Sequence, residues 1–263
     1  MDRSTLIGLS KYKNKSSIIV IEAQTTQKAN ETAAEILQKY SDNKTALFLS
    51  GGTTPKNLYK LISQKKSLKA GAVGLIDERF GKKGYRHSNE LMIKTTGIID
   101  YFENKNTRFY PILQNKDLSL EKTALQYDEA LRFIFEYFPK SVGILGIGED
   151  GHTAGLPASQ RGEPAGAKNS KLKAQSSEIV RKMMEDQSGF IDFYELEGYG
   201  QRITMNFHAL SLLDLVIILV LGREKREALK LMFDDGSIEE VPARFYKKEA
   251  IAKKTILITD QIV

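Results

Sequence analysis

Residues 46–55 read ALFLSGGTTP and combine a short apolar run, a glycine pair and a proline. The run has no polar alternation, which is typical of a strand covered on both faces of a sheet. Gly51 and Gly52 end this strand, and Pro55 stands where the first helical position is expected. Apolar residues at helical spacing follow in residues 58–62. We therefore predict a unit made of a strand, a glycine turn and a helix.

The same alternation extends outward in both directions. Residues 29–40 and 120–138 carry apolar side chains at helical spacing, and Ser119 is expected to cap the second helix. Strands that alternate with helices predict an α/β protein with a doubly wound, mostly parallel sheet. The further runs expected as strands are residues 18–21, 73–76, 142–145, 203–205, 215–221 and 256–258.

One region interrupts this pattern. Residues 158–200 contain glycines and a proline around a polar, lysine-rich centre, with a single helix expected near residues 177–184. The region is too short and too polar to build a core of its own. We expect an irregular insertion or long loop there, within a single domain that spans residues 1–263.

Composition limits the possible chemistry. The chain has 263 residues, of which 41% are hydrophobic and 27% charged, and this length suits one large α/β domain. Because cysteine is absent, disulfides, thiolate metal sites and a cysteine nucleophile are excluded. No G-x-S-x-G motif and no metal-ligand spacing of histidines occurs, so we expect neither a serine hydrolase nor a metal or other cofactor.

Charge and hydropathy limit the partners. The formal net charge of +6 suits an anionic small molecule as well as a nucleic acid. The lysine-rich stretches lack interleaved aromatic residues, and we expect no nucleic-acid partner. Residues 210–221 are too short to span a membrane, and no signal-peptide pattern opens the sequence. We expect a cytoplasmic protein without a membrane partner, either a monomer or a small homo-oligomer.

The glycine turn has the properties of an anion cradle. Ser50, Gly51, Gly52, Thr53 and Thr54 follow a strand directly, and ligands of open α/β sheets bind outside the carboxyl ends of strands. The two glycines allow close backbone approach, and the N-terminus of the following helix points free N–H groups at the turn. A plain tight turn is the alternative, and the Gly-Lys-Ser/Thr of a nucleotide P-loop is absent.

Two other turns carry charged side chains. Asp77 and Arg79 follow the third strand, although a charged turn is often only solvated. Residues 146–153, GIGEDGHT, follow the fourth and contain a formal G-x-G-x-x-G, but the helix and strand that a dinucleotide fold requires do not come next. We interpret the glycines as freeing the backbone so that Asp150 and His152 project into a cleft for acid–base work. A histidine that caps a local turn is the alternative.

Two basic residues stand near predicted strands. Arg202 opens the strand expected at residues 203–205, and Lys225 lies at the start of a helix that follows residues 215–221. A lysine at a helix N-terminus opposes the helix dipole, and an anionic ligand at that place would offset the cost.

These segments together resemble the 6-phosphogluconolactonase family, in the wider group that includes glucosamine-6-phosphate deaminase. The resemblance covers the chain from about residue 18 onward, and its specific part combines two motifs, Ser-Gly-Gly-Thr-Thr-Pro and Asp-Gly-His-Thr-Ala. The matching pieces are Ser50-Gly51-Gly52-Thr53-Thr54-Pro55, Asp77-Glu78-Arg79 with Ser88-Asn89, residues 146–154, Arg202-Ile203-Thr204, and Gly222 with Lys225.

The resemblance implies a modified Rossmann-like α/β/α sandwich and hydrolysis of 6-phospho-D-glucono-1,5-lactone to 6-phosphogluconate in the pentose phosphate pathway. The partner is then a phosphosugar lactone. By resemblance the glycine turn, Arg202 and Lys225 hold the phosphate, and His152 is the base for the attacking water. Arg79 and backbone N–H groups are candidates for stabilising the oxyanion. Asp77 and Asp150 are expected to orient or tune His152.

The sequence departs from the family pattern in three places. Gly155-Leu156-Pro157 lacks the usual aromatic residue before the proline, and residues 197–201, Glu-Gly-Tyr-Gly-Gln, replace a proline-rich approach to Arg202. Residues 80–83, Phe-Gly-Lys-Lys, replace the usual Val-Pro. These changes concern the cleft wall and substrate selectivity more than the chemistry.

Two alternative functions stay open. A deaminase typically has a tyrosine at the position of Arg79 and an Asn-Glu pair at that of Gly155-Leu156, so the lactonase fits better. A non-catalytic sugar-phosphate sensor would keep the phosphate grip, but it has no need for a base, and His152 with Asp150 and Asp77 argues against it.

Overall fold

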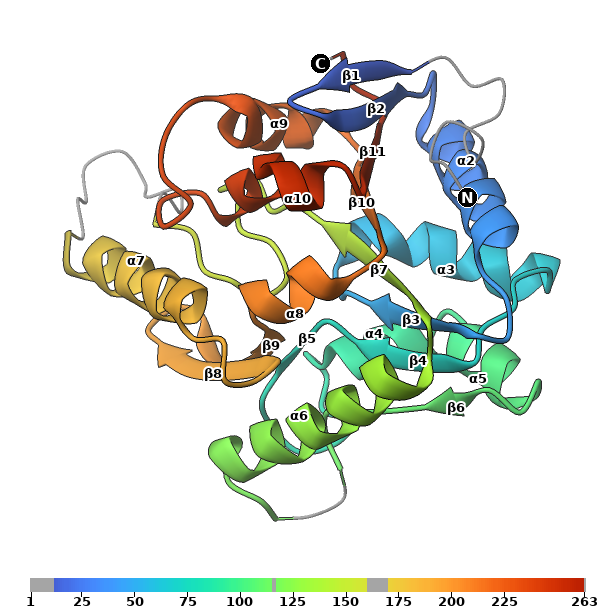
Figure 1. Cartoon of the computed structure of the whole chain (residues 1–263), viewed down its shortest axis with the longest axis horizontal. Coiled ribbons are helices and arrows are strands. Elements are labelled where there is room, and N and C mark those ends of the chain that lie inside the picture. Colours follow the sequence, from blue (N-terminus) through green and yellow to red (C-terminus); the bar gives the residue numbers. More distant parts are fainter. Residues whose placement is uncertain (1–11, 115–116, 160–169, 263) are drawn as a thin grey trace.

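A sheet of eight strands forms the centre of the molecule in the computed structural model, which describes residues 12–114, 117–159 and 170–262 (Figure 1). The strands are β1 (Lys13–Lys15), β2 (Ile18–Glu22), β3 (Thr45–Leu49), β4 (Ala72–Leu75), β6 (Arg108–Phe109), β7 (Lys140–Gly146), β10 (Leu215–Val220) and β11 (Thr255–Thr259). Their spatial order is β1-β2-β11-β10-β7-β3-β4-β6. β1 runs antiparallel to β2, and all other neighbours are parallel.

The central strands are the apolar runs of the sequence. Every residue of β3, β10 and β11 is buried, as expected for strands with helices on both faces. These strands carry β-branched and other large apolar side chains with almost no polar alternation. The predicted fold class, a doubly wound and mostly parallel α/β sheet, is confirmed.

Helices cover both faces of this sheet. α2 (Thr26–Tyr40) and α3 (Thr53–Lys65) lie on one face, and α8 (Phe207–Leu212) and α10 (Glu249–Ala252) lie on the other (Figure 1). α6 (Leu120–Tyr137) begins at the predicted cap, where the Ser119 hydroxyl accepts from the Lys122 N–H. The other helices are α4 (Asn89–Lys94), α5 (Ile98–Glu103), α7 (Ser170–Glu185), α9 (Arg226–Phe233) and the 3₁₀ turns η1 (Arg223–Lys225) and η2 (Pro242–Lys247).

A second, smaller sheet was not anticipated. It consists of β5 (Asp77–Arg79), β9 (Gly200–Met205) and β8 (Ile191–Leu196), which pair antiparallel in that order. The strand expected at residues 203–205 is therefore part of an antiparallel sheet and not of the main one. Polar and apolar residues alternate along β8, so it lacks the continuous apolar run that marks the central strands.

Residues 170–200 are regular, in contrast to the irregular insertion or long loop expected for residues 158–200. They form α7, β8 and the hairpin turn into β9. The many lysines of α7 mask the apolar pattern in its sequence, although Val180 and Met183 are buried on the side that faces the core. The predicted helix near residues 177–184 lies inside α7, and residues 160–169 lie outside the described residues.

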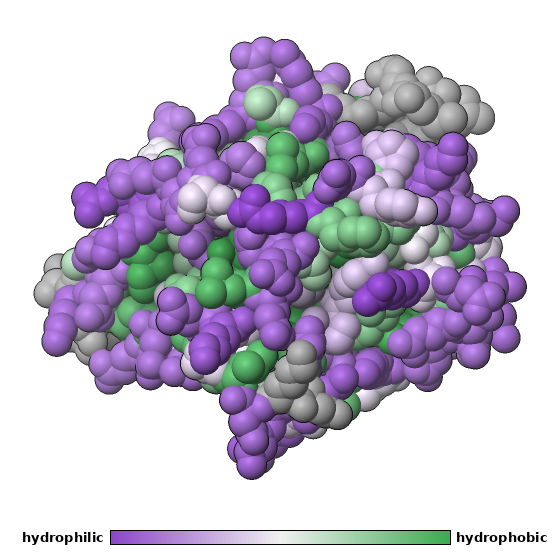
Figure 2. Space-filling view, turned by 60° about the horizontal axis from the view of Figure 1, so that its bottom comes forward, coloured by the Kyte–Doolittle hydropathy of each residue, from purple (hydrophilic) through white to green (hydrophobic). Residues whose placement is uncertain are grey.

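The face of the molecule below α6 is mainly polar. Leu125, Phe133 and Tyr137 of α6 are exposed, and the rings of Phe133 and Tyr137 stack with centroids 5.5 Å apart. Figure 2 shows apolar patches on this side that are separated by polar side chains. Among the described helices, none combines the length and the apolar character needed to cross a bilayer.

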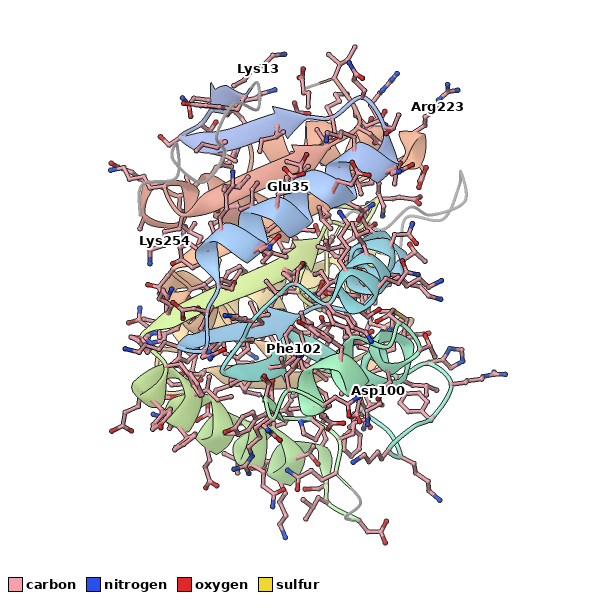
Figure 3. The ribbon with its side chains drawn as sticks, turned by 90° about the vertical axis from the view of Figure 1, so that its right-hand side faces the viewer. Lys13, Glu35, Asp100, Phe102, Arg223 and Lys254 are labelled. Carbon is pink, nitrogen blue, oxygen red and sulfur yellow. The ribbon has the colours of Figure 1, made fainter. Side chains whose placement is uncertain are left out.

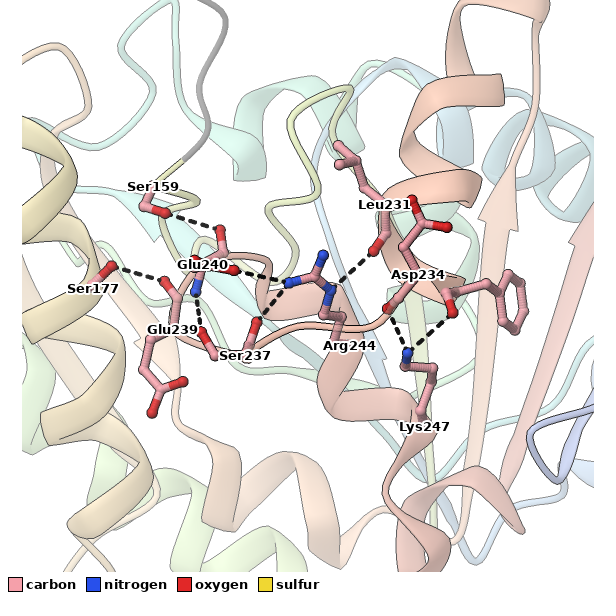
Figure 4. A network of polar contacts seen from close by, with 10 residues as sticks. Ser159, Ser177, Leu231, Asp234, Ser237, Glu239, Glu240, Arg244 and Lys247 are labelled. Atoms are coloured by element: carbon pink, nitrogen blue, oxygen red, sulfur yellow. Dashed lines mark hydrogen bonds and ion pairs between the residues drawn. The ribbon is translucent and has the colours of Figure 1, made fainter. Parts of the chain in front are cut away.

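A buried arginine organises the segment between α9 and η2 (Figure 4). Arg244 is 5% exposed and donates to the carbonyl oxygens of Leu231 and Ser237, both at 3.1 Å, while an ion pair of 3.2 Å joins it to Glu240. The next residue back, Ala243, donates its N–H to the Gly151 carbonyl at 3.1 Å. The end of α9 and the turn after β7 are thus fastened to the same segment.

Candidate active site

The candidate residues gather at one end of the main sheet. Figure 3 shows Arg223, just after β10, and Lys254, just before β11, at opposite ends of the strands. The turns that follow β3, β7 and β10 lie at the Arg223 end, which is the carboxyl end of the parallel strands. This is the edge where open α/β sheets bind ligands.

A narrow cleft of about 160 Å³ lies at this edge. Every residue predicted for the site lines it, except Asp150 and Arg202. Its lining also includes Asn89, Gly148 and Gly155. The predicted residues that line it are Ser50, Gly51, Gly52, Thr53, Thr54, Asp77, Arg79, His152 and Lys225.

The glycine turn leaves donors free at the start of α3. Gly52 is the N-cap with φ 97°, a conformation that favours glycine, and no side chain caps the helix. Gly51 is required by packing, because a Cβ there would lie 2.0 Å from Asn89 Oδ1. Within the described part of the chain, the buried Ser50 Oγ has no hydrogen-bond partner. The turn therefore offers backbone N–H groups and a hydroxyl to an anion.

His152 is held by Asp150 in the turn after β7. The Asp150 Oδ1 lies 2.5 Å from His152 Nδ1 and also accepts the His152 backbone N–H at 3.0 Å. Burial of Asp150 opposes ionisation, but its hydrogen bonds and charge interaction with His152 outweigh this and lower the pKa of Asp150 to about 2. The carboxylate is thus ionised at neutral pH and can only accept, so Nδ1 carries a proton and Nε2 is left as an acceptor.

The glycines of this turn place the imidazole. A Cβ on Gly148 would lie 2.0 Å from His152 Cε1, so the ring packs directly against this glycine. Gly151 has φ 84° and faces Val241, where a Cβ would approach to 2.5 Å. We expected the glycines to let both Asp150 and His152 project into a cleft; His152 lines the cleft, whereas Asp150 does not. Asp150 itself lies behind the imidazole and is 9% exposed at its side chain.

β5 supplies the charged groups on another wall. Asn89 Nδ2 donates to Asp77 Oδ2 at 2.9 Å, and Asn89 Oδ1 accepts from Arg79 Nη1 at 2.5 Å. Burial raises the pKa of Asp77, against the opposing charges of Arg79 and Arg202. Asn89 therefore fixes an acid and a guanidinium in one place beside the glycine turn.

Glu78, between these two residues, is fully buried and points away from the cleft lining. Its carboxylate accepts from the N–H groups of Arg79, Asn89 and Glu90 at 2.6–2.8 Å and from Ser88 Oγ at 2.9 Å. Burial raises the pKa of Glu78 to about 7 despite these four donors. The carboxylate thereby joins β5 to the start of α4.

Sequence reasoning assigned no role to Asn89 or Glu78. Both appeared only within the matching pieces of the family resemblance, Asp77-Glu78-Arg79 and Ser88-Asn89. Their contacts join segments about ten residues apart, and spacing alone does not reveal them. The signals available in the sequence were an acid between two candidate residues and a serine at position 88 that can cap a helix.

The two predicted phosphate-binding cations do not share one cleft. Lys225 lines the narrow cleft with the glycine turn, whereas Arg202 lines an adjoining cleft of about 530 Å³. The two clefts share Gly52, Thr53, Arg79 and Asn89, so they are continuous. Arg202 pairs with Arg79 across β5 and β9, and burial together with this like charge lowers the pKa of Arg202.

No group of three potential metal ligands among His, Cys, Asp and Glu occurs within the described ranges. The titratable side chains in the narrow cleft are Asp77, Arg79, His152 and Lys225. Such a set can take a proton from water, stabilise a developing negative charge and bind an anion.

The fold and the site define a doubly wound α/β protein with a carboxylate-held histidine beside a helix N-terminus that no side chain caps. The family model described as glucosamine-6-phosphate isomerases/6-phosphogluconolactonase matches residues 21–257. The chain belongs to this family.

Individual relatives agree with this assignment. The chain is 26% identical over 226 residues to a 6-phosphogluconolactonase of Rhizobium meliloti, covering 84% of this chain and 88% of the relative. It is 24% identical over 239 residues to a glucosamine-6-phosphate deaminase of Leuconostoc citreum, covering 90% and 94%. In structure it is similar to a 6-phosphogluconolactonase from Plasmodium vivax, with a TM-score of 0.71, 19% identity and coverage of 96% and 94%.

Proposed function

We propose that the protein hydrolyses 6-phospho-D-glucono-1,5-lactone to 6-phosphogluconate. The observation that carries this proposal is the Asp150–His152 pair, with its free Nε2 in the same narrow cleft as Arg79. A lactone carbonyl is already reactive, so one base and one stabiliser of negative charge suffice for its hydrolysis. The family and the lactonases among its similar members support the choice of substrate.

The proposed reaction uses these groups in order. His152 Nε2 takes a proton from water, and the water oxygen forms a bond to the lactone carbonyl carbon. Arg79 and backbone N–H groups stabilise the oxyanion that results. When the oxyanion collapses, the bond to the ring oxygen breaks and His152 returns the proton to that oxygen. The acid formed loses its own proton at neutral pH, so each turnover releases one proton.

The other residues bind and orient. The turn of Ser50, Gly51, Gly52, Thr53 and Thr54 holds the phosphate together with Lys225 and Arg202. Asp150 orients His152 through Nδ1, as a carboxylate does for a catalytic imidazole in other hydrolases. Asp77 acts on the same ring through its charge. Because the proposed substrate belongs to the pentose phosphate pathway, we also propose a cytoplasmic location.

A deaminase is the second candidate, because a deaminase matches the chain over 90% of its length. Its chemistry removes a proton from carbon, opens a sugar ring and releases ammonia, which calls for more acid–base groups than one ring-opening hydrolysis. Deaminases typically have an Asn-Glu pair after the histidine turn, where this chain has Gly155-Leu156. This segment therefore adds no carboxylate to that of Asp77, which lies beside Gly155.

Proton release from freshly generated 6-phosphogluconolactone distinguishes these candidates. We expect the protein to accelerate release well above the spontaneous hydrolysis measured in parallel without it. Absence of acceleration would refute the lactonase. Ammonia release from glucosamine 6-phosphate would then support the deaminase, whereas binding of 6-phosphogluconate without either reaction would support a sensor.

A further inference from the structure

The β8–β9 hairpin holds the catalytic turn through side-chain hydroxyls. Thr204 Oγ1 donates to the Ala154 carbonyl, and Tyr194 Oη donates to the Gly155 carbonyl at 2.5 Å. Both carbonyls belong to residues with positive φ, 50° at Ala154 and 69° at Gly155. A third hydroxyl, that of Tyr199, donates to Asp150 Oδ2 at 3.2 Å. The hairpin thus reaches both the carboxylate and the far end of the turn.

Local geometry sets the position of Tyr199. It stands in the hairpin turn between Gly198, with φ 76°, and Gly200, with φ 71°, conformations that favour glycine at both places. Its N–H donates to the Leu196 carbonyl at 3.0 Å, and its half-buried ring packs against the core. This is the segment that replaces the proline-rich approach to Arg202 usual in the family.

The contact completes the hydrogen bonding of the Asp150 carboxylate. Oδ1 receives the backbone N–H and Nδ1 of His152, while Oδ2 receives the hydroxyl of Tyr199. Donors on both oxygens fix the plane of the carboxylate, and that plane fixes the orientation of the imidazole. Tyr199 Oη also donates to the Ala158 carbonyl oxygen at 3.3 Å, so its single proton is shared between this carbonyl and Asp150 Oδ2.

We propose that Tyr199 is a positioning residue for this enzyme: it orients Asp150 and through it His152. The inference rests on the proposed function for its kinetic consequence, but the hydrogen-bond chain from Tyr199 to His152 exists whatever the substrate is. The titratable groups that face Asp150 are His152 and Tyr199, and Asp77 acts on His152 from β5.

The kinetic test compares Tyr199→Phe with the wild type. Loss of one hydrogen bond to a carboxylate predicts a fall in kcat of about 3–10-fold. Tyr199 lines the adjoining cleft beside Arg202, but phenylalanine keeps the ring in place there, so we expect KM to stay within about twofold. An Asp150 carboxylate with one donor fewer attracts the ring proton of His152 more strongly. We therefore expect the acidic limb of the kcat/KM profile to move to higher pH.

A second measurement does not depend on activity. The chain has three histidines, so the His152 ring signal can be followed by NMR and assigned with His152→Ala. In Tyr199→Phe its titration midpoint should move upward, by up to about one pH unit. Tyr101→Phe is the matched control, because it removes a hydroxyl bond to the Leu68 carbonyl far from the site and should change neither readout.

The outcomes separate the two proposals. If the wild type has no lactonase activity but the His152 midpoint moves in Tyr199→Phe, the proposed function fails and the positioning role stands. If Tyr199→Phe leaves kcat, the acidic limb and the His152 midpoint as they are in Tyr101→Phe, the positioning role is wrong. A rise in KM alone would also overturn it and assign Tyr199 to substrate binding.

Discussion

The turn after β7 and the strand β5 both line the cleft, but they hold their buried carboxyl groups in different ways. Asp150 is paired with an imidazole, and this pairing lowers its pKa to about 2. Glu78 receives only neutral donors, and burial raises its pKa to about 7. The imidazole of His152 can carry a positive charge, and its contact keeps Asp150 ionised. The neutral donors around Glu78 do not keep its pKa low, and their main effect is to join β5 to the start of α4.

The largest effect on activity should come from a substitution in the turn after β7. His152→Ala removes the proposed base and should lower kcat by about 10²–10⁴-fold, with binding of 6-phosphogluconate largely retained. Proton-release assays measure kcat, and calorimetric titration measures the binding of 6-phosphogluconate. His208→Ala is the control, because His208 stacks on Phe190 and does not line the cleft. Unchanged turnover in His152→Ala would remove this residue from the mechanism.

A smaller effect is expected on the β5 side. Arg79→Ala removes the proposed stabiliser of the oxyanion and should lower kcat by about 10²-fold. Arg79→Lys keeps the charge but loses the bidentate fork, so its kcat should fall between those of Arg79→Ala and the wild type. If Arg79→Ala raises KM and leaves kcat unchanged, Arg79 binds the substrate in the ground state and does not stabilise the oxyanion.

Binding of the product tests the two cations. Lys225→Ala and Arg202→Ala should each weaken 6-phosphogluconate binding by about 10-fold, as expected for the loss of a charged hydrogen bond. Lys225 lies in the cleft with the glycine turn, so we expect the larger loss there. Calorimetric titration of both variants gives the comparison. Normal affinity in both would refute the phosphate assignment.

Glu78→Gln should produce the smallest effect, and it acts on stability. Its amide group would face backbone donors, which predicts a loss of about 1–3 kcal/mol in the free energy of unfolding at pH 5. The folded-state pKa of Glu78 lies above its ordinary value of 4.5, so the contribution of Glu78 is full below about pH 4.5 and is lost as pH rises through about 7. Urea titrations should therefore show a smaller difference between variant and wild type at pH 8. A difference that grows from pH 5 to pH 8 would contradict this sign.

The elements that could be predicted are those whose burial is evident from an apolar run in their own sequence. β10 and β7 have both faces covered, so their apolar runs identify them, and the turns after them were located correctly for the same reason. β5 and β8 alternate or are very short, and α7 carries a lysine-rich surface, so their sequences do not show what they pack against.

The site was predictable to the same extent. His152 and the glycine turn stand next to strong strands, whereas Asn89 and Glu78 act through contacts that only the folded chain creates. The separation of Arg202 from Lys225 also depends on the second sheet, because β9 directs Arg202 into the adjoining cleft. The motifs pointed to the candidate residues, and the antiparallel sheet determines how these residues are arranged.

The position of β11 in the main sheet affects how this protein can fold during synthesis on the ribosome. β2 (Ile18–Glu22) has no direct pairing with β10, because β11 (Thr255–Thr259) lies between them. The first segments to be synthesised must wait for residues 255–259 before they can join the sheet. Such long-range pairing slows folding and leaves strand edges exposed meanwhile. Chaperone binding to the nascent chain should therefore persist until these residues have left the exit tunnel.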